Sequence, residues 1–231
     1  MIHPEKFAAG MKLQLARFKK ASDEGMTRRG WKVAINVPEV LQHLDLPHSG
    51  VGWIDGHHVL ASGESFKSPA DAKLLIEPEV AIHIAVNVSS SSDANAARKC
   101  IGGLSPALEI VNYSDAGAGF DEIVAASMFH AASVVGAVSS LDRASELGSR
   151  WPVLHVDDTR AEDPREDLVP ADLGEVVAFV AAYLSEFGEG LEAGDLILSG
   201  SYTAKALPIL PGQEAIADYG PLGRVSVTIA D

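Results

Sequence analysis

The segment that most restricts the fold is a long run rich in β-branched residues, LLIEPEVAIHIAVNV, which extends from Leu74 to Val88. Valine and isoleucine favour extended backbone because their branched side chains pack well on a pleated surface. The run is therefore predicted to form a buried strand. Two acidic residues, Glu77 and Glu79, interrupt it on either side of Pro78. A buried strand that contains two acids needs a physical explanation.

Glu77 and Glu79 are two positions apart, so their side chains project from the same face of a strand. Burying an unpaired carboxylate is costly, and two adjacent ones require a compensating cation. A third acid, Glu109, lies in a second apolar run, LSPALEIVNY, far enough along the chain for a loop and a crossover helix to place the strands side by side. Oxygen ligands of this kind suit Mg²⁺ or Mn²⁺. The alternative is that this face is exposed and the acids are merely solvated.

The rest of the chain reads as many short strands and a few helices. We predict helices over 4–24, 38–44, 121–130 and 174–187, a helix N-cap at Asp93, and strands over 31–36, 133–141 and 151–158. Because no regular alternation of strand and helix is present, we expect an α+β fold around a folded-over mixed sheet, with a doubly wound sheet as the second choice. A junction near residue 60 would divide the chain into 1–60 and 61–231.

Composition excludes several classes of function. The formal net charge of -14 argues against a nucleic-acid partner, which needs a basic surface. No run approaches the roughly 20 apolar residues of a membrane-spanning helix, and no signal-peptide core is visible at the N-terminus. The single cysteine, Cys100, excludes an internal disulfide framework. We therefore expect a soluble, cytoplasmic protein without a membrane partner.

Five segments together carry a family resemblance: GWKVAIN, IEPEVAIHIA, LSPALEIVNYS, GEGLEAGDLILSGS and PGQEAIADYGPLGRVSVTI. In this order, from about residue 5 onward, they resemble the fumarylacetoacetate hydrolase superfamily, and within it the 2-keto-4-pentenoate hydratases and 4-oxalocrotonate decarboxylases. The resemblance implies a mixed β-roll. Residues 1–60 would be a small helical and strand extension packed on the core, and residues 61–231 the metal-binding catalytic domain.

The resemblance also implies roles for individual residues. Lys32, in GWKVA, matches a lysine that reaches toward the metal-bound substrate, although a surface lysine at a strand end is the alternative. Gly200 and Ser201, in LSGSYT, match a segment that holds the carboxylate end of the substrate. The ligands of a Mg²⁺ or Mn²⁺ ion would be the three glutamates, Glu77, Glu79 and Glu109.

Two departures from the family pattern concern the reacting end of the substrate. Related hydratases often carry Asp-Phe-Gly where this chain has His48-Ser49-Gly50, and an Asp-Asn pair where it has Ala125-Ala126-Ser127. His48 either replaces the missing acid as a base near neutral pH or is an idle loop histidine. His130 is either a catalytic residue or a hydrogen-bonded core residue. Neither departure touches the metal ligands.

The implied chemistry is that of a small 2-oxo acid, whose enolate a divalent cation stabilises. The first expectation is a lyase that hydrates a 2-hydroxy-2,4-dienoate. A decarboxylase or a C–C bond hydrolase on the same scaffold is the second. A catalytically silent 2-oxo-acid-binding partner of an active subunit is the third. Related proteins assemble, so we also expect a homo-oligomer, a dimer or larger, and consider a complex with a related enzyme.

Overall fold

The computed structural model describes residues 4–115, 117–142, 152–170 and 172–231, and within these ranges it contains two mixed β-sheets. The larger sheet has the order β2-β1-β10-β5-β6-β7-β3, with β11 also paired to β5, and the smaller has the order β4-β13-β12-β8-β9. Strands β1 and β10, β3 and β7, and β4 and β13 pair in parallel. The strands are β1 (Arg28–Ala34), β2 (Gly50–Asp55), β3 (Val59–Ala61), β4 (Ser65–Lys67), β5 (Leu74–Ile84), β6 (Ile101–Asn112), β7 (His130–Val135), β8 (Val153–Val156), β9 (Thr159–Arg160), β10 (Leu196–Leu198), β11 (Leu207–Ile209), β12 (Glu214–Asp218) and β13 (Arg224–Ala230).

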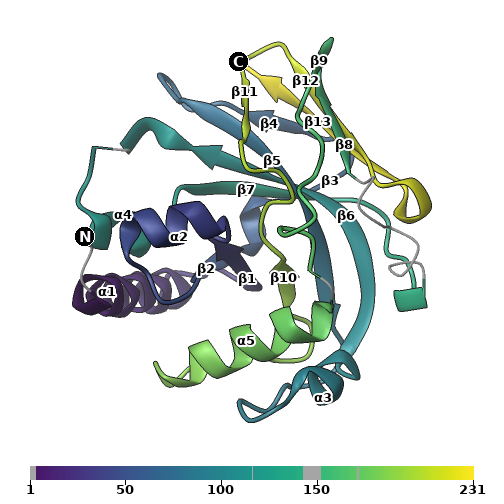
Figure 1. The fold of residues 1–231 in the computed structure, drawn as a ribbon. Coiled ribbons are helices and arrows are strands. Elements are labelled where there is room, and N and C mark those ends of the chain that lie inside the picture. Colours follow the sequence, from purple (N-terminus) through teal and green to yellow (C-terminus); the bar gives the residue numbers. More distant parts are fainter. Residues whose placement is uncertain (1–3, 116, 143–151, 171) are drawn as a thin grey trace.

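The larger sheet curls over on itself. Its two end strands, β2 and β3, are joined by a single short 3-10 helix, Gly56–His58, so the ends of the strand order must lie close together. Figure 1 shows the long strands β5 and β6 bending to make this curve. Residues of β2, β5, β6 and β10 form a small apolar cluster: Ile54, Ala81, Ala107, Leu196 and Leu198. The expected α+β class with a folded-over mixed sheet is confirmed.

Helices cover the outside of the curled sheet. Helices α1 (Pro4–Asp23) and α4 (Phe120–Ala125) pack against each other, and α3 (Ala94–Arg98) packs against α5 (Leu173–Ser185). Figure 1 shows α2 (Pro38–Leu44) on the same side as α1 and α4, with α3 and α5 at the end of the molecule opposite the small sheet. No helix in the described part of the chain combines the length and the apolar character needed to cross a bilayer.

Most helix predictions are confirmed. Helices α1, α2 and α5 lie at or close to their predicted bounds. The carboxylate of Asp93 accepts a hydrogen bond from the Ala96 amide at the start of α3, as predicted for an N-cap. The connection from β5 to β6 differs from the expectation. It holds only the short helix α3, and the two strands are antiparallel, so no crossover helix is required.

Several boundaries were predicted wrongly. Strand β1 runs over Arg28–Ala34, whereas the sequence indicated 31–36. Strand β5 ends at Ile84, and Val88 beyond it forms an isolated bridge with Leu191. Helix α4 ends at Ala125 instead of continuing to residue 130. Strand β7 accordingly starts at His130 and ends at Val135, whereas the sequence indicated 133–141.

The segment between α4 and β7 explains the last two errors. Ser127, Met128 and Phe129 have φ angles of 51°, 50° and 68°, which form a left-handed turn without any glycine. Such a conformation costs roughly 1–2 kcal/mol for each residue that has a Cβ atom. The turn reverses the chain in a few residues, so β7 begins early.

The boundary near residue 60 stays a prediction. Strands β1 and β2, which precede it, belong to the same sheet as β5, β6 and β7, which follow it.

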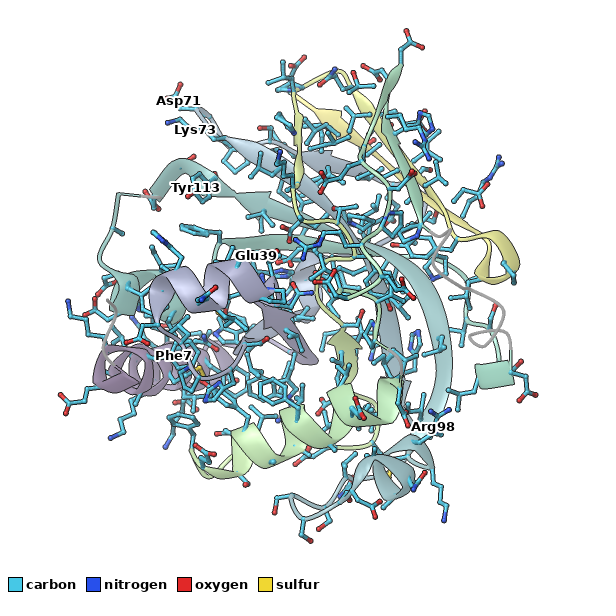
Figure 2. The ribbon with its side chains drawn as sticks, in the orientation of Figure 1. Phe7, Glu39, Asp71, Lys73, Arg98 and Tyr113 are labelled. Atoms are coloured by element: carbon cyan, nitrogen blue, oxygen red, sulfur yellow. The ribbon has the colours of Figure 1, made fainter. Side chains whose placement is uncertain are left out.

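The segment between β9 and α5 is attached to α2. Arg165 in this segment donates hydrogen bonds of 3.1 and 2.9 Å to Glu39, which Figure 2 labels.

Candidate metal centre

The three predicted ligands lie together on the inner face of the larger sheet. Glu77 on β5 is the direct cross-strand partner of Glu109 on β6, and Glu79 projects from the same face of β5. One oxygen atom of each carboxylate lies within 4.8 Å of the others. Glu79 and Glu109 are buried, and Glu77 is partly buried. The acids are therefore not a solvated surface pair.

Glu79 and Glu109 each have one oxygen held by the protein. The Gly200 amide donates a 2.8 Å hydrogen bond to Oε2 of Glu79, whose buried Oε1 has no partner among the described residues. Oε1 of Glu109 accepts hydrogen bonds from Nζ of Lys32 and, at 2.8 Å, from Nδ1 of His130. Among the described residues, Oε1 of Glu79 is thus left for another ligand.

The pKa values reflect a shortage of positive charge. Burial, reinforced by the charge of Glu109, raises the pKa of Glu77 to about 7. The same two causes raise the pKa of Glu79 well above its usual value. Burial also acts to raise the pKa of Glu109, but the Lys32 ammonium and the hydrogen bond from His130 outweigh it and lower that pKa to about 2. The centre thus favours protons, or another cation, on two of its three acids.

These residues fit a hard divalent cation. Three carboxylates and one ammonium leave two net negative charges, which one divalent ion neutralises. The donor set consists only of oxygen atoms, as Mg²⁺ and Mn²⁺ prefer. The unpartnered Oε1 of Glu79 is the atom that such an ion would satisfy.

Lys32 is a buried part of the centre and not a surface lysine. Its side chain is 2% exposed, and Nζ also donates to the Met128 carbonyl at 3.3 Å. Strand β2 passes close to it at Gly52, where an added Cβ would lie 3.2 Å from Cγ of Lys32 and from Cβ of Ser127. The left-handed turn and this glycine together form the wall around the lysine stem.

His130 lies between the acids and two openings in the surface. Its ring is buried, with Nδ1 on Glu109 and Nε2 without a partner among the described residues. Burial lowers its pKa despite the opposing effect of Glu109. The ring lines a cleft of about 630 Å³ beside Asn112 and Phe129, and a second of about 260 Å³ beside Ser127 and His58. A neutral His130 that donates through Nδ1 has a free lone pair at Nε2.

His48, the other predicted catalytic histidine, lies in an aromatic cluster. Its ring centroid is 5.7 Å from that of Phe7, 5.9 Å from Phe179 and 5.3 Å from Tyr183, and Nδ1 bonds the Ser49 carbonyl at 2.8 Å. Figure 2 labels Phe7, which α1 contributes to this cluster. The contacts of His48 are thus with α1 and α5, and none joins it to the three glutamates, so its catalytic role stays a prediction.

The predicted substrate-binding turn is bonded to Glu79 and to itself. Gly200 has a φ of 93°, a conformation suited to glycine, and an added Cβ would meet Asn36 at 2.9 Å. Its amide holds Glu79, whereas the Ser201 hydroxyl donates to the Thr203 carbonyl at 3.0 Å. The role of both residues toward a substrate stays a prediction.

Sequence reasoning missed Ser133. This fully buried serine on β7 is the cross-strand partner of Glu109, and its hydroxyl has no partner among the described residues. Its signal in the sequence was a polar residue that opens the apolar run from 133 onward. Only the register of β6 and β7 shows that this residue faces the acids.

Comparisons with known proteins agree with the fold. The family model of the fumarylacetoacetate (FAA) hydrolase C-terminal domain matches residues 31–230. The structure is similar to 4-oxalocrotonate decarboxylase from Pseudomonas putida G7, complexed with magnesium and adipate, with a TM-score of 0.85, 20% identity and coverage of 96% of this chain and 86% of that one. No curated protein matches.

Two further solved structures share the fold at lower similarity. One is fumarylpyruvate hydrolase from Pseudomonas aeruginosa in complex with Mn²⁺ and pyruvate, with a TM-score of 0.66 and 16% identity over 88% of this chain and 89% of that one. The other is 5-carboxymethyl-2-hydroxymuconate delta-isomerase from Mycobacterium smegmatis, with a TM-score of 0.64 and 18% identity over 87% and 77%. With the family model spanning most of its length, the chain belongs to the fumarylacetoacetate hydrolase family.

Proposed function

We propose that the protein is a divalent-metal-dependent enzyme that acts on a small 2-oxo acid through an enolate. The observation that supports this most directly is the buried group of Glu77, Glu79 and Glu109, whose charge Lys32 offsets only in part. Magnesium and Mn²⁺ are present in the structures of two similar proteins, one with adipate and one with pyruvate. A divalent ion at the three glutamates would stabilise negative charge that develops on the 2-oxygen of such an acid.

The protein's own residues provide the remaining functions. Lys32 and His130 fix the orientation of the Glu109 carboxylate by binding the same oxygen atom. The Gly200 amide does the same for Glu79. His130, kept neutral by burial, leaves Nε2 as a proton acceptor, and the residue lines the two clefts. It is therefore the residue we assign to proton transfer at the part of the substrate that lies beyond the chelated end.

We propose hydration of a 2-hydroxy-2,4-dienoate as the first candidate reaction, which makes the protein a hydro-lyase. The second candidate is decarboxylation of a related 2-oxo acid, favoured by the similarity to a 4-oxalocrotonate decarboxylase over 96% of this chain. Cleavage of a C–C bond and a silent 2-oxo-acid-binding subunit are the remaining alternatives. We also propose that the chain forms a homo-oligomer.

An assay with one panel of acids separates these reactions. The purified protein is mixed with 2-hydroxy-2,4-dienoates and 2-oxo diacids in the presence of Mg²⁺ or Mn²⁺, and with EDTA as a control. Loss of dienoate absorbance without release of CO₂ supports the hydratase, CO₂ release supports the decarboxylase, and two smaller acids support the hydrolase. Binding of oxalate without any turnover would identify a silent subunit and refute the enzymatic proposal.

A further inference from the structure

Ser133 is a buried polar residue that lies between an apolar neighbour on β3 and an acid on β6. Its inward-facing neighbours are Val59 on β3, Val135 on β7 and Ala107 on β6, and its only polar cross-strand partner is Glu109. The side chain is fully buried and its Oγ atom has no hydrogen-bond partner among the described residues. An unpaired hydroxyl in such a place destabilises the folded protein.

The carboxylate opposite Ser133 on β6 does not bond this hydroxyl. Glu109 has its Oε1 atom occupied by Lys32 and His130, and Ser133 makes no bond to either of its oxygens. Val135 occupies the next inward position of β7, so this face of the strand accommodates an apolar β-branched side chain. The serine therefore places, opposite Glu109, a polar group that the described residues leave unpaired.

We propose that Ser133 is a positioning residue of the metal centre, whose hydroxyl holds a water molecule in the coordination shell of the cation bound by Glu77, Glu79 and Glu109. This inference rests on the proposed function. Three carboxylates supply too few ligand atoms for an octahedral ion such as Mg²⁺, which retains several waters. A water at one of these positions needs an acceptor or donor in the wall, and groups of this kind affect metal affinity by about 10- to 100-fold.

The test compares Mn²⁺ binding with stability in the metal-free protein. Calorimetric titration with Mn²⁺ is carried out on the wild type, Ser133→Ala and Ser133→Thr, which retains a hydroxyl. Ser105→Ala is the matched control, because Ser105 is also fully buried on the same face of β6 as Glu109 but bonds His83 at 2.8 Å. We expect Ser133→Ala to bind Mn²⁺ about 10- to 100-fold more weakly. Ser133→Thr should restore most of the affinity, and Ser105→Ala should bind as the wild type does.

Stability distinguishes this role from a structural one. Since the Ser133 hydroxyl is unpaired without metal, Ser133→Ala should leave the metal-free unfolding temperature unchanged or raise it, whereas Ser105→Ala should lower it. Unchanged Mn²⁺ affinity in Ser133→Ala overturns this inference alone. Weakened affinity that accompanies a lowered metal-free unfolding temperature also overturns it. If the wild type does not bind Mn²⁺, both this inference and the proposed function fail.

Discussion

Lys32 and Glu109 form an ion pair inside the larger sheet, although β10 and β5 separate their strands. The two side chains are only 2% and 1% exposed. They meet because the sheet curls, which brings the inner face of β1 over the inner face of β6. The position of this pair links the fold to the chemistry, because the same carboxylate that binds Lys32 is one of the three candidate metal ligands.

Replacing Lys32 by methionine should destabilise the metal-free protein. The change leaves three carboxylates without a buried cation, and removing one partner of a buried pair costs about 3–5 kcal/mol. We expect a lower unfolding temperature in EDTA and a larger stabilisation by Mn²⁺ than in the wild type, measured by thermal unfolding. Lys73→Met, at an exposed position, is the control. Equal metal-free stability of Lys32→Met and the wild type would show that the pair contributes nothing.

The contribution of Glu77 to the stability of the metal-free protein should fall as pH rises. Burial raises the pKa of Glu77 from 4.5 to about 7, so the folded chain holds this proton more tightly than the unfolded chain. The resulting stability is present below about pH 4.5 and is lost as pH rises through about 7. We expect Glu77 to contribute a loss on the order of 2 kcal/mol between about pH 5 and about pH 8.

Urea unfolding in EDTA at several pH values measures this loss. Glu77→Gln, which cannot ionise, should show a flatter dependence, and saturating Mn²⁺ should remove the decline in the wild type. A metal-free wild type that becomes more stable over this pH interval, relative to Glu77→Gln, contradicts the expected sign.

The substitution Gly52→Ala should lower the turnover number kcat. The added methyl group would lie 3.2 Å from Cγ of Lys32 and from Cβ of Ser127, so the lysine stem must move. A displacement of this kind lowers turnover by about 10-fold or more. Gly190→Ala is the control, since an added Cβ there meets nothing within 4 Å. Steady-state kinetics of both variants decide the matter, and equal kcat values for Gly52→Ala and Gly190→Ala would refute the prediction.

Replacing each of the two predicted catalytic histidines by alanine should affect different properties of the protein. His130 bonds Glu109 and lines both clefts, so His130→Ala should reduce kcat by about 100-fold or more. His48 packs among Phe7, Phe179 and Tyr183, so His48→Ala should mainly lower the unfolding temperature. Comparison of kcat with thermal stability for each variant separates the two roles. A large loss of kcat in a stable His48→Ala protein would reassign the base.

The sequence was sufficient for features that depend on local spacing. The placement of Glu77 and Glu79 on one face follows from the two-residue period of a strand, and the ends of α1 and α2 follow from apolar periodicity and from Pro38. Features that depend on non-local geometry were not predictable. The contact of Lys32 with Glu109 depends on the curl of the sheet. The position of Ser133 opposite Glu109 depends on the register of β7 with β6.

The left-handed turn at 127–129 was not predictable from the sequence for a different reason. No glycine or asparagine marks it, so local propensity favoured continuation of α4. Tertiary contacts outweigh that preference: the turn places the Met128 carbonyl on Lys32 and His130 on Glu109. Strain of this kind is concentrated at functional sites.

The central claim is that Glu77, Glu79 and Glu109 bind one hard divalent cation. Electron paramagnetic resonance tests it directly, because Mn²⁺ loses its sharp solution signal when it binds a protein. Titration of the metal-free wild type with Mn²⁺ should show a single saturable site, and Glu79→Gln, which removes one ligand charge, should weaken binding by about 100-fold or more. Absence of saturable binding to the wild type, or equal binding by Glu79→Gln, would contradict the account.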